Sequence, residues 1–373
     1  MKCEIEFLPV GNASKPGDAI VVRYGSPDAY EIMVIDGGTL ETGDMLVAHL
    51  RKHFGPYVTL THVVLTHSDA DHASGLRTVL KEIPVTNLWL HVPWLHASAS
   101  KPYFLNKTWA DERLSIAIKK EYDIVAEILD TAIQNRISIR EPFVGEMIGP
   151  FHVLSPHKEM YELLLPQFER TPEPDQAAIA AKGWWIGPKS GGMLSSLFEK
   201  AIAKVQNKWV TETWEHELLK DGGVTGASNE SSVVLYCNLD EGQKILLNGD
   251  AGVWALSVAA YFAEHYKFPL REFTFVQVPH HGSRRNVGPT ILNRLIGPIQ
   301  PKGTQTRFTA FVSSPPEDDV HPRKMVTNAF LRRGGCVVAT QGTAKIHYGG
   351  FPSRLGYVGV KPVEFSPSVE EYD

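Results

Sequence analysis

The 373-residue sequence has few cysteines and no long hydrophobic segment. Cys3, Cys237 and Cys336 are too few and too far apart for a disulfide framework or a CxxC metal pair, so each is interpreted as a buried free thiol. No apolar run approaches the roughly 20 residues that a transmembrane helix needs. The N-terminal segment MKCEIEFLPV also lacks the basic and apolar pattern of a secretion signal. These absences predict a cytoplasmic protein that does not enter a membrane.

The sequence also lacks an excess of positive charge and any known nucleotide-binding motif. Its formal net charge is -5, which argues against a broadly basic surface that coats nucleic acid but is compatible with a local basic groove. Neither GxGxxG nor a Walker motif occurs, and no repeat of fixed period is found. With 43% hydrophobic and 21% charged residues, the composition is typical of a globular protein that buries a substantial core.

Short apolar runs between turn residues predict strands towards both ends of the chain, and helical periodicity dominates the middle. This order predicts an α/β (α+β) protein built as an αβ/βα sandwich rather than a doubly wound sheet. We expect a single domain over residues 1–373, with its core at about 4–92 and 228–348. Residues 93–148 and 156–228 are predicted to be largely helical insertions, and residues 349–373 a C-terminal tail. The predicted strands are Glu4–Leu8, Ala19–Tyr24, Ile32–Ile35, Thr61–Thr66, Asn87–His91, Phe151–Leu154, Ser232–Cys237, Lys244–Asn248, Phe273–Val278, Phe308–Ser313, Cys336–Gln341 and Ala344–Tyr348.

The segment THSDADHASG, residues 66–75, carries the strongest chemical signal. In an extended backbone, the alternating His67, Asp69 and Asp71 would point the same way, and the turn that follows could bring His72 to the same point. Carboxylates so close together repel one another unless a cation lies between them. The alternative is a solvated turn rich in helix-capping residues. Four metal-competent side chains directly after a buried strand favour a metal site.

Polar residues follow other apolar strands in the same way. Asp250 ends the run ILLNGD, and the pair His280–His281 ends VQVPHH. A lone carboxylate at the end of a buried strand is costly without a partner, and a histidine doublet before Gly-Ser is typical of ligands. Asp36 in MVIDGG is either a ligand-side residue or a strand-ending turn, and His321 in DVHPRK is either a surface residue or a substrate contact.

At this point the chain resembles the metallo-β-lactamase superfamily, and within it the hydrolase domain of ComEC-type competence proteins. The usual superfamily signature H-x-H-x-D-H here reads H-x-D-x-D-H, with Asp69 at the second histidine, as is typical of the ComEC-like branch. The motifs that carry the resemblance occur in the order of that branch: FLPVGNASKPGDAIVV, MVIDGG, VLSP, NESSVVLY, LLNGD, VPHHGS and VHP. The resemblance implies a metallo-β-lactamase-like four-layer αβ/βα sandwich with helical insertions, without the membrane part of the competence proteins.

The resemblance also implies a centre of two divalent metal ions. His67 and Asp69 would hold one ion, Asp71 and His72 the other, Asp250 would bridge them, and His280 or His281 would complete the set. The third histidine of zinc β-lactamases has no counterpart in a matching motif, since only His152 and His157 lie near VLSP. An oxygen-rich set favours Mn²⁺, with Zn²⁺ next and Mg²⁺ as a further option.

Such a centre predicts a metallohydrolase, and the ComEC-like resemblance points to a phosphodiesterase or nuclease acting on nucleic acid or nucleotides. Asp71 would orient or deprotonate the attacking water. His321 is a second catalytic candidate, and the predicted substrate-binding residues are Ser283, Arg284, Arg285 and Arg323. Two alternatives remain: hydrolysis of an ester, lactone, thioester or β-lactam, and an inactive scaffold. The helical insertions could bind a protein partner or a second copy of the chain.

Overall fold

The computed structural model describes residues 1–11, 16–183, 209–239, 242–357 and 359–372. Among these residues, seven strands form a first sheet in the order β15-β1-β2-β3-β4-β5-β6. Its strands are β1 (Lys2–Phe7), β2 (Ile20–Ser26), β3 (Ala29–Ile35), β4 (Leu60–Val64), β5 (Val85–Trp89), β6 (Ser138–Arg140) and β15 (Lys345–His347). β3, β4, β5 and β6 run parallel, whereas β15, β1, β2 and β3 pair antiparallel.

A second sheet of the described chain repeats this plan in the order β14-β13-β12-β11-β10-β8-β7. Here β11 to β14 run parallel, and β7, β8, β10 and β11 pair antiparallel. Its strands are β7 (Met147–Ile148), β8 (Phe151–Ser155), β10 (Val234–Asn238), β11 (Lys244–Leu247), β12 (Phe275–Gln277), β13 (Phe308–Val312) and β14 (Gly335–Ala339). A separate ribbon joins β9 (Trp209–Thr211) to β16 (Ser368–Glu370).

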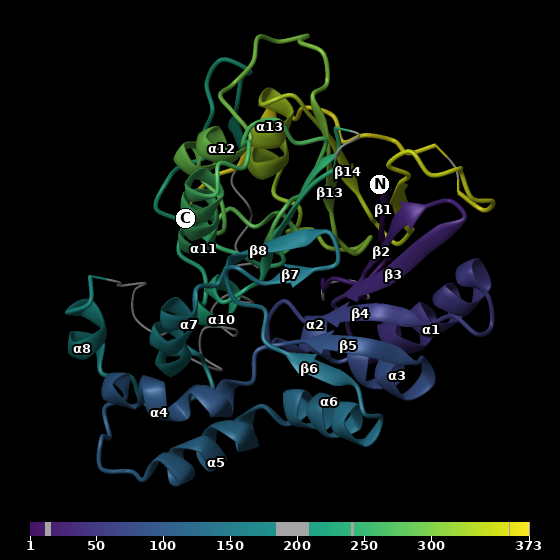
Figure 1. The fold of residues 1–373 in the computed structure, drawn as a ribbon. Coiled ribbons are helices and arrows are strands. Elements are labelled where there is room, and N and C mark those ends of the chain that lie inside the picture. Colours follow the sequence, from purple (N-terminus) through teal and green to yellow (C-terminus); the bar gives the residue numbers. More distant parts are fainter. Residues whose placement is uncertain (12–15, 184–208, 240–241, 358, 373) are drawn as a thin grey trace.

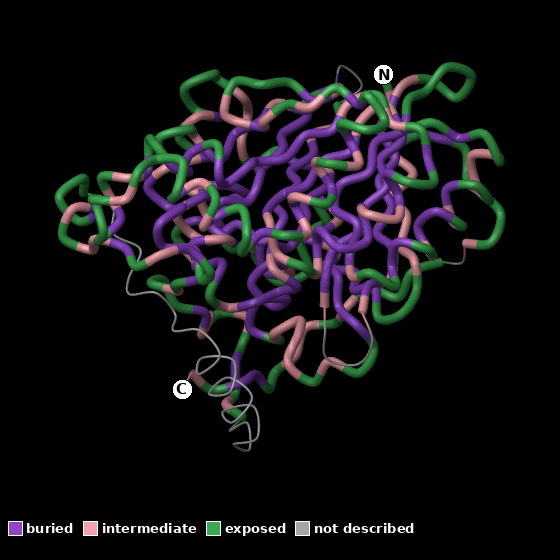
Figure 2. The backbone as a smooth tube through the Cα atoms, turned by 90° about the horizontal axis from the view of Figure 1, so that it is seen from below, coloured by how far each residue is buried: buried purple, intermediate pink, exposed green. Residues whose placement is uncertain are grey.

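The two sheets pack face to face, and helices cover their outer faces (Figure 1). Successive side chains along a strand point to opposite faces of the sheet. Ile5 and Phe7 of β1 face the second sheet, and Phe7 packs edge-on against Phe311 at 5.6 Å between ring centres. In β3, Val34 points the other way, into the core beneath the helices. Strands that are apolar on both faces require cover on both sides, which gives the predicted four-layer αβ/βα sandwich. Figure 2 shows the buried backbone concentrated in the centre of the molecule.

The helices of the first half lie against the first sheet and those of the second half against the second (Figure 1). The first group comprises α1 (Leu40–Phe54), α2 (Ala70–Ala73), α3 (Leu76–Glu82), α4 (Ala97–Ser100), α5 (Asp111–Glu121) and α6 (Asp123–Gln134), with the 3₁₀ turns η1 (Pro93–His96) and η2 (Lys101–Tyr103). The second group comprises α11 (Val253–His265), α12 (Pro289–Leu295), α13 (Lys324–Arg332) and the 3₁₀ turn η4 (His280–Gly282). Between them lie α7 (Lys158–Leu164), η3 (Leu165–Gln167), α8 (Gln176–Ala180) and α10 (Ala227–Glu230). None of the helices within the described ranges is long and apolar enough to cross a membrane.

Two regions differ from the expected pattern. Within the insertion predicted over residues 93–148, the helical pattern is divided into α5 and α6, because the backbone of Tyr122 leaves the helical region at φ -115° and ψ 49°. Residues 209–226 form β9 and coil rather than helix, because β9 pairs with the C-terminal strand β16. Residues 184–208 of the insertion predicted over 156–228 lie outside the described residues.

The C-terminal tail is bound to the body of the molecule at two places. Arg354 lies 3.2 Å from the buried carboxylate of Glu4 and also binds Glu6. Further on, β16 pairs with β9, and the main-chain carbonyl of Glu371 accepts a hydrogen bond from Arg284 at 2.8 Å. The segment around Glu371 therefore lies beside Arg284, which follows the histidine doublet in the sequence.

Candidate metal centre

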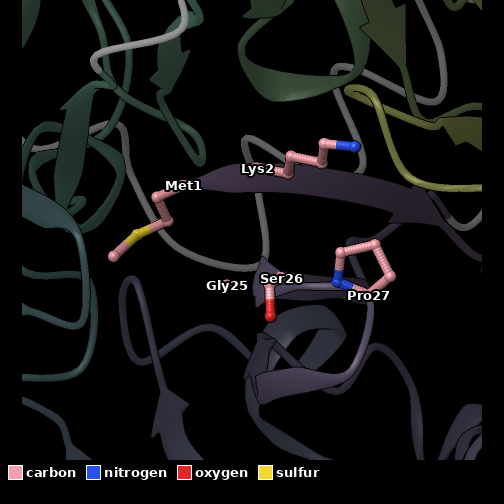
Figure 3. Close-up of a pocket in the computed structure, with 5 residues that line it drawn as sticks. All are labelled: Met1, Lys2, Gly25, Ser26 and Pro27. Carbon is pink, nitrogen blue, oxygen red and sulfur yellow. The ribbon is translucent and has the colours of Figure 1, made fainter.

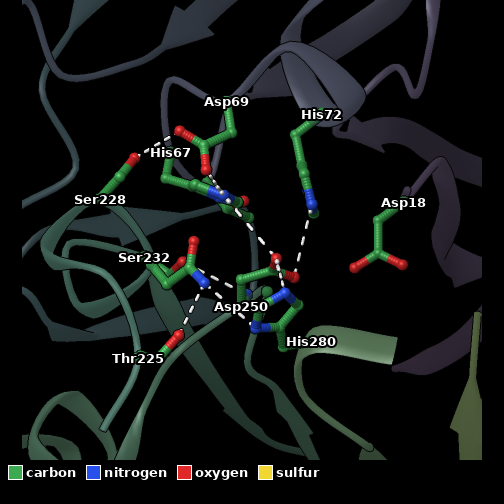
Figure 4. A network of polar contacts seen from close by, with 12 residues as sticks. Asp18, His67, Asp69, His72, Thr225, Ser228, Ser232, Asp250 and His280 are labelled. Atoms are coloured by element: carbon green, nitrogen blue, oxygen red, sulfur yellow. Dashed lines mark hydrogen bonds and ion pairs between the residues drawn. The ribbon is translucent and has the colours of Figure 1, made fainter. Parts of the chain in front are cut away.

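The predicted ligands come together at one edge, where the parallel strands of both sheets end. Thr66 and His67 follow β4, Asp250 follows β11, and the histidine doublet follows β12. The carboxyl ends of parallel strands lie at the same edge of a sheet, so residues far apart in the sequence meet there. Figure 4 shows His67, His72 and His280 around Asp250.

Asp250 is the centre of this arrangement. It is 2% exposed, and four imidazole Nε2 atoms surround its carboxylate. Their distances from the nearer carboxylate oxygen are 3.4 Å for His72, 3.6 Å for His280, and 3.9 Å each for His67 and His281. Two atoms bound to the same ion at about 2.1 Å are about 3–4 Å apart, so these spacings fit shared ligands.

Three of the four histidines direct their Nε2 lone pairs towards Asp250 because their Nδ1 atoms have fixed acceptors. The His72 Nδ1 lies 2.7 Å from Asp36 Oδ2, and a carboxylate only accepts. The His67 Nδ1 lies 3.1 Å from Thr66 Oγ1, whose proton is donated to Asp36 at 2.7 Å. Each Nδ1 must therefore carry the proton, which leaves Nε2 free to bind a metal ion.

His280 follows the same rule through an asparagine. The Asn286 amide nitrogen donates to the carbonyl of Asp250 at 2.7 Å, so its oxygen faces the His280 Nδ1 at 2.9 Å and accepts that proton. The amide nitrogen of Asn229, which donates to Thr225 Oγ1 at 2.8 Å, lies 3.1 Å from the same ring nitrogen. Both His280 and His281 adopt positive φ angles, 45° and 55°, which turn the two rings towards Asp250 from one short turn.

The two remaining aspartates of the motif lie at the open side of the centre. Asp69 Oδ2 lies 3.5 Å from His67 Nε2, and its other oxygen accepts a hydrogen bond from Ser228 at 2.6 Å. Asp71 forms a group with His72 and His281 in which one ligand atom from each lies within 4.8 Å of the others. A second such group joins His67, His72 and Asp250, and a third joins Asp18, Asp36 and His72, so His72 belongs to all three.

The donor set fits a divalent cation. Within the described residues, the His67 Nε2, His72 Nε2, Asp250 Oδ1 and His281 Nε2 are buried without a hydrogen-bond partner. Buried polar atoms without partners are costly, and a cation shared among them would satisfy all four. Burial alone would raise the pKa of Asp250, but His280 and His72 hold it well below its usual range. Burial lowers the pKa of His281 to about 3, so its ring is neutral, as a ligand must be.

The predicted substrate-binding residues surround the histidine doublet. Ser283 is buried, and its hydroxyl accepts the Arg285 backbone N–H at 3.3 Å. Arg285 is exposed, whereas Arg284 faces the tail and lies over the Tyr372 ring at 4.7 Å. The backbone N–H of Arg323 donates to the carbonyl of Gly282 at 3.1 Å, which places the HPR segment against the doublet. His321, in that segment, is half-buried and lies 3.2 Å from Asp318.

Other sequence candidates lie elsewhere or act differently. His152 packs against Phe268, and His157 pairs with exposed Glu159 at 2.6 Å, so neither reaches Asp250 as a third histidine. The backbones of Gly37 and Gly75 pack closely together. A Cβ added to Gly75 would lie 2.0 Å from the carbonyl oxygen of Gly37. The contact binds the strand end at Asp36 to the helix that follows His72.

Several residues of the centre were not identified from the sequence. Ser228, Asn229 and Asn286 hold Asp69 and His280, and Asp18 lies buried beside His281. Two of these residues do lie in motifs of the resemblance. Asn229 begins NESSVVLY, and Asp18 belongs to FLPVGNASKPGDAIVV. A hollow of about 320 Å³ lined by Met1, Lys2, Gly25, Ser26 and Pro27 lies at the opposite end of β2 from Asp18, away from the centre (Figure 3).

Comparison with known proteins agrees with this geometry. Residues 16–142 match the model of the metallo-β-lactamase superfamily, and this span contains Asp36 and the whole HSDADH motif. This part of the chain is therefore similar to the metallo-β-lactamase superfamily. The superfamily consists of metal-dependent hydrolases, which supports hydrolysis as the general class of activity and a metal ion as cofactor. No curated protein sequence matches the chain.

Solved structures of this fold resemble the metallo-β-lactamase domain at low identity. The metallo-β-lactamase fold protein YhfI from Bacillus subtilis is 8% identical, with 93% of this chain and 100% of that chain covered at a TM-score of 0.40. Zn²⁺-bound PqqB from Methylobacterium extorquens is 13% identical, with 92% and 99% covered at a TM-score of 0.37.

The Asp36–His72 contact leads to a first prediction. Asp36→Asn is expected to weaken divalent-metal binding about 10- to 100-fold, because partners that fix a ligating histidine typically contribute that much. The measurement is calorimetric titration of metal-free protein with Zn²⁺ or Mn²⁺. Asp28→Asn, in an exposed turn, is the control and should bind as the unaltered protein does. Equal affinity in the two variants would show that Asp36 does not orient His72.

Proposed function

We propose that the protein is a metal-dependent phosphodiesterase or nuclease that cleaves its substrate with a metal-activated water. The observation that carries this proposal is the carboxylate of Asp69, which stands beside His67 where the usual signature has a histidine. With Asp71 and Asp250 it makes the open side of the centre rich in oxygen ligands. Oxygen-rich sites favour harder, more highly coordinated ions, which supports Mn²⁺ first, Zn²⁺ second and Mg²⁺ as a further option, with two ions per chain.

The surroundings of the centre support an anionic substrate. Arg285 and Arg323 belong to the two segments that meet at Gly282, beside His281. Guanidinium groups bind phosphate oxygens through paired N–H donors, and Ser283 could add a hydroxyl. Arg284 is already bound to the carbonyl of Glu371, so its role towards substrate would depend on the C-terminal tail. The motif resemblance to the ComEC-type hydrolase domain supports nucleic acid or nucleotides as the substrate class.

The residues of the centre have separable roles in this proposal. Bound divalent ions would lower the pKa of a water molecule and polarise the attacked phosphate. Asp71, half-buried at the open side, would accept the proton of that water or orient it. Asp36, Thr66 and Asn286 accept the Nδ1 protons of the histidine rings. The Nε2 atoms of His67, His72 and His280 therefore face Asp250. His321, in the segment that packs against Gly282, would contact the leaving group.

Metal removal tests the proposal directly. Chelated protein is expected to lose hydrolysis of bis(p-nitrophenyl) phosphate, and reloading with Mn²⁺ or Zn²⁺ should restore it. An ester, a lactone and a β-lactam reporter are measured on the same samples. Metal-restored hydrolysis of these reporters without phosphodiester cleavage would contradict the proposal and assign the centre to carboxylic substrates. No hydrolysis of any reporter under any reloading would favour a binding protein.

A further inference from the structure

One histidine of the centre lacks the partner that the other three have. The Nδ1 atoms of His67, His72 and His280 lie 2.7–3.1 Å from acceptors that fix their protons. His281 is 2% exposed, and neither of its ring nitrogens has a hydrogen-bond partner in the part of the chain that is described. Its Nε2 faces Asp250 like the others, so the missing contact is on the Nδ1 side.

A buried carboxylate stands on that side. Asp18 Oδ1 lies 4.0 Å from the His281 Nδ1, and Asp18 is 2% exposed. The residue precedes β2, which runs antiparallel to β3, so it lies at the same sheet edge as Asp36. Figure 4 shows the carboxylate of Asp18 beside the histidine group, on the side away from His67.

The carboxylate of Asp18 is held in place by a polar network that also reaches Asp250. Its Oδ2 accepts a hydrogen bond from the Gln277 amide at 2.7 Å. The Gln277 oxygen in turn accepts the backbone N–H groups of Asn248 and Gly249 at 2.9 and 3.1 Å, immediately before Asp250. A carboxylate this deeply buried is costly without hydrogen bonds, and burial raises the pKa of Asp18 to about 7. Gln277 provides one hydrogen bond, and a proton donated by the His281 Nδ1 would provide another.

We propose that Asp18 is the positioning residue of His281: it accepts the Nδ1–H proton and so directs the Nε2 lone pair towards Asp250. Asp18 then does for His281 what Asp36 does for His72, and each of the four histidines has an acceptor behind it. The ring and the carboxylate need to approach by about 1 Å to reach the length of an ordinary hydrogen bond. This role rests on metal binding at the centre and is independent of which bond the enzyme hydrolyses.

A double-mutant cycle on metal affinity tests this assignment. Zn²⁺ and Co²⁺ are titrated into metal-free unaltered protein, Asp18→Asn, His281→Ala and the double variant, and the visible spectrum of bound Co²⁺ is recorded. We expect Asp18→Asn to weaken binding about 10- to 100-fold and to change the Co²⁺ spectrum, but to cost little further affinity once His281 is alanine. Asp28→Asn is the exposed control. The melting temperature of each metal-free protein reports any structural effect separately from metal affinity.

Two outcomes would overturn the proposal. An equal loss of affinity from Asp18→Asn with and without His281 would show that Asp18 does not act through that histidine. Loss of a whole equivalent of bound metal in Asp18→Asn alone would show that Asp18 is itself a ligand. If Asp18→Asn does not fold, proton NMR of the metal-loaded unaltered protein decides: a hydrogen-bonded His281 Nδ1–H resonance, assigned by its loss in His281→Ala, supports the role, and its absence refutes it. None of these readouts requires a substrate, so failure of the phosphodiester assignment would not affect them.

Discussion

Asp250→Asn is expected to bind metal at least about 100-fold more weakly and to lose metal-dependent hydrolysis with it. Removal of an outer-shell partner already costs about 10- to 100-fold in affinity, and Asp250 is the group that all four histidines face. Asparagine keeps the shape of the side chain but removes the charge and replaces one ligand oxygen with an amide nitrogen that cannot bind a cation. Elemental analysis of the purified variant and a calorimetric titration measure the effect.

The comparison needs a variant that changes charge without touching the centre. Asp44→Asn, on the exposed side of α1, makes the same chemical change far from the strand ends. It should keep its metal content and activity. Full metal content in Asp250→Asn would mean that this carboxylate is not a ligand, and the group around His72 and Asp71 would then have to hold the ion.

Asp71→Asn is expected to reduce kcat about 100- to 10,000-fold while the ion at His67, His72 and Asp250 stays bound, because positioned general bases typically contribute that much. The group that joins His67, His72 and Asp250 does not include Asp71, so one set of ligands remains intact in the variant. Steady-state hydrolysis of the phosphodiester reporter under saturating metal measures the change.

Metal analysis of the same sample separates two roles for Asp71. A loss of activity that follows a proportional loss of metal would assign the residue to metal binding and contradict the prediction. Unchanged activity with full metal would remove Asp71 from the mechanism altogether. Asp44→Asn again serves as the control for the charge change.

The sequence alone determined the strands, the chemical motifs and the general class of the fold. Apolar runs such as THVVLT and KILLN are local signals, and they predict strands because a strand buried on both faces must be apolar throughout. HSDADH is equally local, since its spacing is set by the chain itself. The order of the motifs was sufficient to suggest the metallo-β-lactamase superfamily, and the match over residues 16–142 supports it.

Only the tertiary structure decided what supports those motifs. Asn286 and Asn229 reach His280, and Asp18 reaches His281, through contacts between segments with no shared spacing in the sequence. A single Asp or Asn gives no signal of its own, because such residues are common in turns. The direction of Arg284 towards the tail depends on the pairing of β16 with β9, which brings the C-terminus beside the histidine turn. Local residue patterns predict which side chains can bind a metal ion, whereas long-range packing determines which nitrogen of each histidine is free to do so.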